Sequence, residues 1–279
     1  MEKHRKKLIK NAAVFDGHSS GLAHGKKIVI EDDLVTEITG DEVSEENFGE
    51  VFDGTGMVAM PGMTDAHVHM GCLFAKGEFP VDYATVLTVA KCKDALMAGF
   101  TTFRDAGSVS EGLKLAFDEG VLPGPRIYPC GAYISQTCGH GDSEYAHTYR
   151  DIQYRHPSST VLADGVPEII RAVREQFYRG ASHIKLMATE ILNRHEDIRL
   201  LFGTDMMITG PDYQVEQSED IRYYEKRFGT MRALRALTGT ANEVFALTTY
   251  QNPYPKGKIG VLEAGSYADL LLVDGDPTK

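Results

Sequence analysis

The segment Pro61-Gly62-Met63-Thr64-Asp65-Ala66-His67-Val68-His69 joins a turn dipeptide to a strand-like run that ends in two histidines. Residues i and i+2 of a strand project from the same face, so the imidazoles of His67 and His69 point to one side. Neutral imidazole nitrogen is a common zinc ligand, and two on one face supply half of a metal site. Two unrelated histidines are the alternative interpretation, because this spacing is common by chance.

Downstream of this segment, strand-like apolar runs alternate with runs of helical hydrophobic spacing. The strand-like runs are 63–70, 100–103, 126–135, 183–188 and 199–203, and the helical runs are 83–98, 112–118, 167–178 and 231–247. Repeated strand–helix units are typical of parallel α/β folds, and chemistry at strand ends favours a (β/α)8 barrel of the TIM type. We expect residues 61–247 to form this barrel.

Short strand-like runs with turn residues between them occur near both ends of the chain. These runs are 27–30, 34–38, 51–52, 57–60, 257–262 and 268–273. The first two flank Glu31-Asp32-Asp33 and have the pattern of a β-hairpin. Two strand-rich ends around a different centre predict one small β-sandwich domain, assembled from residues 1–60 and 248–279.

Three motifs in order resemble those of the amidohydrolase superfamily. They are the segment 61–69, the segment 98–105 (Ala-Gly-Phe-Thr-Thr-Phe-Arg-Asp), and the stretch from Gly124-Pro125-Arg126 to Gly139-His140-Gly141-Asp142. The third is similar to the branch of imidazolonepropionase-like enzymes and metal-dependent dipeptidases acting on Xaa-Pro, Xaa-Arg or Xaa-Lys substrates. The resemblance runs through nearly all of the chain. It implies a metal-dependent hydrolase barrel flanked by a β-sandwich.

Lys185 lies inside the apolar run 183–188. A charged lysine is costly to bury, so it reaches water, pairs, or has its pKa lowered until the neutral amine can react. The resemblance implies a specific role: this lysine takes up carbon dioxide, and the carbamate bridges two divalent metal ions, with zinc the expected metal. A lysine that reaches water at a strand end is the alternative.

Two further residues are candidates from their position in the resembled pattern. Asp205 follows an apolar run, where the pattern has a metal-binding aspartate that can also move a proton during catalysis. An aspartate that caps a turn or helix is the alternative there. His140 lies between two glycines, which suit a tight turn, and a contact with the substrate is a weaker hypothesis for it.

The interval from Lys185 to Asp205 is only 20 positions long, whereas one strand–helix unit needs about 30 residues. The fifth to seventh barrel units therefore do not fit, and no residue matches the histidine ligands that the resemblance implies after the fifth and sixth strands. Three explanations stay open. The sequence is part of a longer protein, it has a true internal deletion, or it is a rearranged, oligomeric protein that borrows the missing wall from a partner.

Composition excludes several other classes of protein. The net charge of −11 argues against nucleic acid or an anionic membrane as the main partner. No window approaches 18 uninterrupted apolar residues, so no membrane span is expected. The four cysteines show no CxxC pairing, which favours reduced thiols in a cytoplasmic protein.

The function implied by the resemblance is metal-dependent hydrolysis of an amide bond, with a metal-bound hydroxide as the nucleophile. His67 and His69 would hold one metal, carbamylated Lys185 would bridge to a second, and Asp205 would move the proton. The expected substrate is a dipeptide or an N-acyl amino acid. The alternatives are a cyclic amide, as for imidazolonepropionase-like enzymes, and a non-catalytic remnant of such an enzyme.

Overall fold

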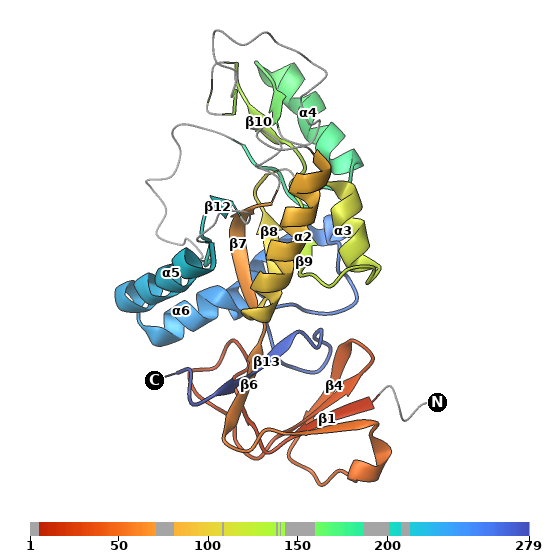
Figure 1. Ribbon diagram of the computed structural model, residues 1–279, viewed down its shortest axis with the longest axis vertical. Helices are drawn as coiled ribbons and strands as arrows, with labels where there is room; N and C mark the ends of the chain where they lie inside the picture. Colours follow the sequence, from red (N-terminus) through yellow and green to blue (C-terminus); the bar gives the residue numbers. More distant parts are fainter. Residues whose placement is uncertain are drawn as a thin grey trace.

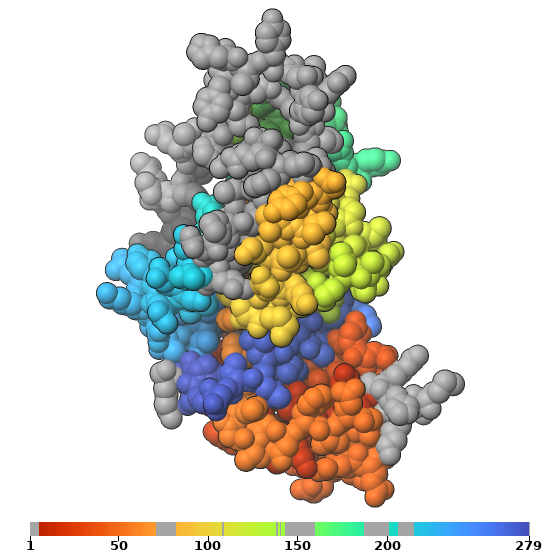
Figure 2. Space-filling view, in the orientation of Figure 1, coloured from red at the N-terminus to blue at the C-terminus, as the bar shows by residue number. Residues whose placement is uncertain are grey.

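The computed structural model describes residues 6–70, 81–107, 109–137, 139, 141–142, 160–186, 201–207 and 213–278. The strands from the two ends of the chain lie at one end of the molecule, and the β/α part lies above them in Figure 1. In the space-filling view, residues from the C-terminus lie against those of the N-terminal strands (Figure 2).

The N-terminal residues form a four-stranded sheet with the order β4-β3-β1-β5. Its strands are β1 (Lys6–Lys10), β3 (Lys27–Glu31), β4 (Leu34–Thr39) and β5 (Glu50–Asp53). β3 and β4 pair antiparallel around a turn in which Asp32 has a φ of 55°, so the expected hairpin is confirmed. Ile28, Ile30 and Val35 alternate toward a buried cluster, as the strand period requires.

A three-stranded sheet joins the two ends of the chain. Its order is β13-β6-β2, from β13 (Leu270–Asp274), β6 (Met57–Pro61) and β2 (Ala13–Val14). β13 pairs antiparallel with β6, with Leu270 opposite Pro61. The expected strand over 257–262 was wrong: only an isolated bridge from Lys258 forms there. Gly260 has a φ of 77°, which is incompatible with an extended strand.

The central sheet is parallel throughout and has the order β12-β7-β8-β9. Its strands are β7 (Met63–His69), β8 (Phe100–Asp105), β9 (Arg126–Tyr128) and β12 (Met206–Met207). Within the described ranges these strands form an open sheet. The expected α/β class is therefore confirmed, but a closed (β/α)8 barrel is not what this part of the chain forms.

Helices cover the central sheet and bury its apolar side chains. α2 (Val81–Met97) packs against β8, α3 (Glu111–Asp118) against β9, and α6 (Thr230–Leu237) against β7 (Figure 1). The core between them contains Val68, Phe100, Phe103, Ile127 and Phe202, all almost completely buried. The expected helices over 83–98 and 112–118 are thus confirmed.

Two expected strands differ from what the structure contains. The run 126–135 was predicted as one strand, but β9 ends at Tyr128 and β10 (Tyr133–Ser135) pairs instead with β11 (Thr160–Leu162). Gly131 lies between them with a φ of 69°, which interrupts the extended backbone.

The run 199–203 was also predicted as a strand. Its described residues contain none, and the strand in that part of the chain is β12. Of the expected strand 183–188, the described residues have a single bridge, from Leu186 to Ile134.

The remaining helices match the sequence only in part. α4 (Val166–Tyr178) agrees with the expected helix over 167–178. The expected helix over 231–247 divides at Thr238 and again after Phe245, which gives three pieces. α5 (Tyr213–Phe228) was not expected, because its sequence is too polar for an apolar stripe to stand out. The pieces after α6 are α7 (Gly239–Phe245) and the 3-10 helix η4 (Ala246–Gln251). Across the described ranges, we find no helix with both the length and the apolar character needed to cross a membrane.

Candidate metal site

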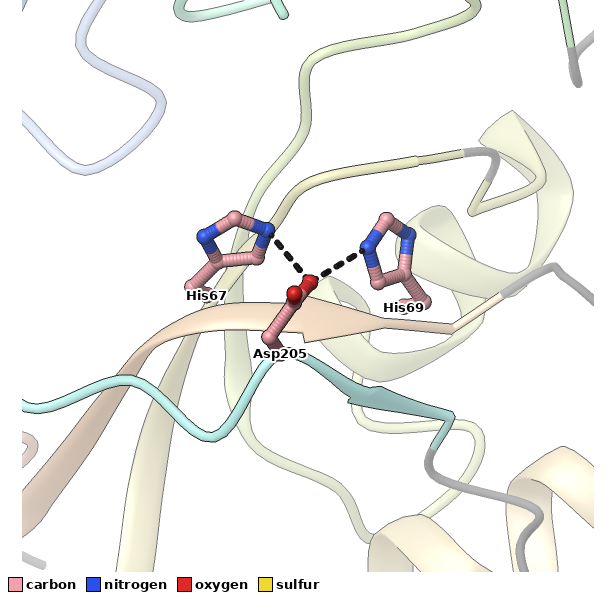
Figure 3. A group of neighbouring side chains, drawn as sticks. All are labelled: His67, His69 and Asp205. Atoms are coloured by element: carbon pink, nitrogen blue, oxygen red, sulfur yellow. Dashed lines mark hydrogen bonds and ion pairs between the residues drawn. The ribbon is translucent and has the colours of Figure 1, made fainter. Parts of the chain in front are cut away.

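Three side chains converge at the carboxyl ends of β7 and of the segment that leads into β12. The Nε2 atoms of His67 and His69 lie 2.9 Å and 3.1 Å from the same Oδ1 atom of Asp205. The two imidazoles stand on one face of β7, with the carboxylate between them (Figure 3). One ligand atom from each residue lies within 4.8 Å of the other two. The strand geometry expected for the histidine pair is therefore observed.

Close packing of the backbone places Asp205 beside the histidines. Its backbone N–H donates to the carbonyl of His67 at 2.7 Å, although its φ of 56° is a left-handed conformation that few residues adopt. A Cβ at Gly203 would lie 2.7 Å from the Cβ of His67, so glycine is needed for this approach. Aspartate tolerates the left-handed region better than most residues.

Lys185 joins the same group at the Nε2 atom of His67. Its Nζ lies 2.9 Å from the Nε2 of His67, and its backbone carbonyl accepts a hydrogen bond from Ile134 at 2.9 Å. The four residues predicted from the sequence as metal ligands therefore lie together in the structure.

The electrostatic environment keeps His67 neutral. Burial and the charge of Lys185 together lower the pKa of His67 to about 4, although the charge of Asp205 acts in the opposite direction. A neutral imidazole is the form that binds a metal ion. Because its single Nε2 faces both a lysine nitrogen and a carboxylate oxygen, it cannot satisfy both by hydrogen bonding in one tautomer.

The donor set fits a divalent transition metal. Two imidazole nitrogens and one carboxylate oxygen are the ligand types found in catalytic zinc sites. The side chain of His69 is 12% exposed, that of His67 36% and that of Asp205 72%, so exposure increases from the histidines toward the carboxylate. Open access on one side is what a catalytic metal site requires, in contrast to a closed structural one.

Two further histidines bear on this group. His140, the proposed substrate contact, lies outside the described residues. His183 is described and is not part of the ligand group; the Oγ of Ser182 lies 3.0 Å from its Nδ1. Burial and the charge of Arg104 together lower the pKa of His183 to about 3, so this imidazole is also neutral.

Two buried aspartates that support the site were missed by the sequence analysis. Asp105 accepts hydrogen bonds from the backbone N–H groups of Met70 and Val109, and so fixes the chain after β7 and after β8. Complete burial raises its pKa to about 7. Asp65 accepts hydrogen bonds from residues on both sides of the site. Both belong to motifs quoted above, but their partners are distant in sequence.

Comparison with known proteins identifies the family. A family model described as the amidohydrolase family matches residues 58–197, which is half of the chain. The chain belongs to the amidohydrolase family. The matched range includes both β7 histidines and Lys185, and the family resemblance expected from the sequence is confirmed.

Ochratoxinase from Aspergillus niger is similar in sequence to this amidohydrolase-family chain. The two are 34% identical over 152 residues, which cover 47% of this chain and 31% of the relative. The chain thus spans about a third of the length of that curated relative.

Solved structures share the fold of this amidohydrolase-family chain. A crystal structure described as an amidohydrolase matches with a TM-score of 0.82 at 22% identity, covering 98% of this chain and 93% of that one. A prolidase complexed with N-methylphosphonate-L-proline matches with a TM-score of 0.76 at 21% identity, covering 98% and 93%. The crystal structure of ochratoxinase from A. niger matches with a TM-score of 0.77 at 19% identity, covering 99% and 91%. These likenesses support the α/β fold.

Proposed function

We propose that this chain hydrolyses an amide bond with the help of a divalent metal held by His67, His69 and Asp205. The convergence of their three ligand atoms within 4.8 Å is the observation that supports the proposal best. Membership of the amidohydrolase family makes hydrolysis the expected class of reaction. When bound, the metal would supply Lewis-acid polarisation of a carbonyl oxygen and an activated water near neutral pH.

Three residues of the chain have proposed roles in holding the metal ions. His67 and His69 orient the metal from β7, and the low pKa of His67 keeps a lone pair available for it at neutral pH. Lys185, with its Nζ 2.9 Å from His67, is close enough to bridge to a second ion as a carbamate formed with carbon dioxide. We propose zinc as the metal at both positions.

Asp205 is the proposed proton carrier. Its carboxylate reaches the metal ligands, and its side chain is 72% exposed on the side from which a substrate would approach. It can accept a proton from the attacking water and return it to the leaving amine nitrogen. Asp205 would therefore act both as a ligand and as the general base.

The proposed substrate is a dipeptide or an N-acyl amino acid. A fold shared with a prolidase complexed with N-methylphosphonate-L-proline and a sequence relative named ochratoxinase both support this class. A cyclic amide is the second candidate within the same chemistry. His140 stays a proposed substrate contact, on sequence grounds alone.

The larger organisation of the protein is also a proposal. We infer an incomplete, TIM-barrel-like unit over residues 61–247, a composite β-sandwich from residues 1–60 and 248–279, a cytoplasmic location and a homo-oligomeric state. Pairing of β13 with β6 supports the composite unit. A barrel without its fifth to seventh units stays a prediction. An intact mass of the natural protein near 30.7 kDa would support the deletion, and a clearly larger mass would contradict it.

The experiment that tests the function is a hydrolysis assay on the purified chain, stripped of metal by a chelator and then reconstituted with zinc. The panel contains dipeptides ending in Pro, Arg or Lys, N-acyl amino acids and a cyclic amide. We expect turnover of at least one acyclic amide, dependent on added zinc and lost in Asp205→Asn. Tight zinc binding without turnover of any compound would favour the non-catalytic remnant and contradict the proposal.

A further inference from the structure

Asp65 lies on β7 two positions before His67, and its side chain is completely buried. The Asp65 carboxylate lies next to the backbone of the first imidazole ligand, because it accepts the hydrogen bond of the His67 N–H at 3.2 Å. A buried carboxylate is costly unless hydrogen bonds compensate it. This residue is not itself a member of the ligand group, so its burial at this position needs a different explanation.

The carboxylate of Asp65 connects three segments of the chain. Its Oδ1 accepts hydrogen bonds from the backbone N–H of His67 and of Thr204, both at 3.2 Å. Its Oδ2 accepts from the Thr204 hydroxyl at 2.9 Å and from the Gln217 amide at 3.4 Å. Asp65 thus ties β7 to the residue before Asp205 and to α5.

The position of this carboxylate coincides with an irregularity in the sheet. The register between β7 and β8 shifts between Asp65 and Val68, so His67 lies inside the shift. Such a bulge redirects a side chain and leaves a backbone N–H without its ladder partner. The Asp65 carboxylate accepts the hydrogen bond of the His67 N–H at this point, and so restrains the backbone that carries the imidazole.

The same carboxylate acts on the neighbouring segment. Asp205 has a left-handed φ of 56°, a conformation that persists only where the surroundings hold it. Its own N–H donates to His67, and the preceding residue, Thr204, is held through both its N–H and its hydroxyl by Asp65. One buried group therefore restrains the backbone on both sides of the ligand pair.

We propose that Asp65 is a positioning residue that sets the separation between the His67 imidazole and the Asp205 carboxylate. This inference rests on the proposed metal site for its functional meaning, but the restraint itself is a property of the metal-free chain. A purely structural role would lower stability without a specific effect on segment 201–207 or on metal geometry.

The test uses Asp65→Ala, Asp65→Asn and Thr204→Val, with Gln176→Ala as a matched control. Gln176 is also buried, and its Oε1 accepts from the Ala132 N–H at 2.8 Å; it lies on α4, outside β7 and outside segment 201–207. Two readouts are taken on each full-length variant. They are amide hydrogen exchange of segment 201–207 without metal, and the affinity and absorption spectrum of bound Co²⁺.

We expect Asp65→Ala to speed exchange in segment 201–207 by about tenfold. Its Co²⁺ affinity should fall about 10- to 100-fold, with an altered spectrum. Asp65→Asn keeps one acceptor oxygen for the two backbone N–H groups. Its exchange rate in segment 201–207 and its Co²⁺ affinity should therefore lie close to those of wild type. Thr204→Val should weaken Co²⁺ binding less, and should add nothing in the Asp65→Ala background because both changes break one link. Gln176→Ala should leave exchange and spectrum unchanged.

The outcomes separate this inference from the proposed function. If wild type binds Co²⁺ but neither Asp65→Ala nor Thr204→Val changes exchange or affinity, the positioning role is wrong. If Gln176→Ala changes exchange and Co²⁺ affinity as much as Asp65→Ala does, the effect of Asp65 is one of general stability, and the positioning role is wrong as well. If Asp65→Ala does not fold, the exchange of segment 201–207 and the Co²⁺ affinity of Thr204→Val test the positioning role. Values equal to those of wild type would then contradict it. If wild type binds no Co²⁺ while the exchange effects occur, the metal function fails and the restraint stands.

Discussion

The Nζ of Lys185 lies 2.9 Å from the Nε2 of His67, although 118 positions separate the two residues in the chain. One belongs to β7, and the other to a segment whose backbone bonds to β10. Their meeting brings the lysine amine, where the proposed carbamate would form, to within hydrogen-bonding distance of an imidazole nitrogen. This relationship is the structural basis for expecting a second metal ion.

Replacement of Lys185 tests the carbamate directly. Lys185→Arg keeps the positive charge but cannot form the carbamate, so we expect it to lose one of two metal ions. Loss of several kcal/mol of transition-state stabilisation would lower kcat/KM by about 100-fold or more. Metal analysis and NMR with 13C-labelled bicarbonate measure these effects. An unchanged metal content together with wild-type activity would rule out the bridge.

Replacement of either β7 histidine should remove metal affinity without unfolding the chain. His67→Ala and His69→Ala each delete a ligand, so we expect affinity for Zn²⁺ to fall by more than about 100-fold. Loss of a residue that only hydrogen-bonds to a metal ligand typically costs less than this. His24→Ala, at an exposed position, is the control and should bind as wild type does. Titration calorimetry makes the comparison. Equal affinities for all three variants would mean that the metal binds elsewhere.

The sequence predicted which side chains meet at the candidate site better than it predicted the architecture that surrounds them. The strand period places the His67 and His69 imidazoles on one face, whereas grouping them with Asp205 and Lys185 needed the order of motifs in the resembled family. The carboxylate of Asp65 was missed because its partner Thr204 is 139 positions away, and no local pattern reveals such a hydrogen bond.

The same limit explains the errors in the fold. The strand predicted over 126–135 is apolar enough to be continuous, but the left-handed φ of Gly131 divides it. A glycine does not reveal from sequence which φ it adopts. The open edge of the central sheet depends on which strands meet in space, and hydrophobic periodicity does not contain that information.

Stability should vary with pH through Asp105. Its folded pKa is about 7, above the ordinary value of 3.8, because the group is completely buried. Between these values the folded chain keeps the proton and the unfolded chain loses it, so the free energy of unfolding falls as pH rises, by about 1.4 kcal/mol per pH unit at most. Asp105→Asn lacks this titration, so its free energy of unfolding relative to that of wild type should increase from pH 4 to pH 7. Chemical denaturation at several pH values measures this difference, and a difference that does not change with pH would refute the assignment.

Gly203 should be sensitive to the smallest substitution. The methyl group in Gly203→Ala would lie 2.7 Å from the Cβ of His67 and 3.0 Å from its backbone nitrogen, so the segment before β12 must move away from β7. We expect a loss of about 1–3 kcal/mol in the free energy of unfolding, with weaker metal binding. Gly112→Ala, where nothing lies within 4 Å of the new methyl group, is the control and should be neutral or slightly stabilising. Chemical denaturation with a metal titration compares them, and equal behaviour would contradict the close approach.

The metal content of the purified chain tests the central claim most directly. Elemental analysis of wild type and of the double variant His67→Ala/His69→Ala, both dialysed after incubation with zinc and bicarbonate, gives the number of ions per chain. We predict two ions in wild type and close to none in the double variant, with both proteins folded by circular dichroism. Wild type that retains no more zinc than the double variant would contradict the account.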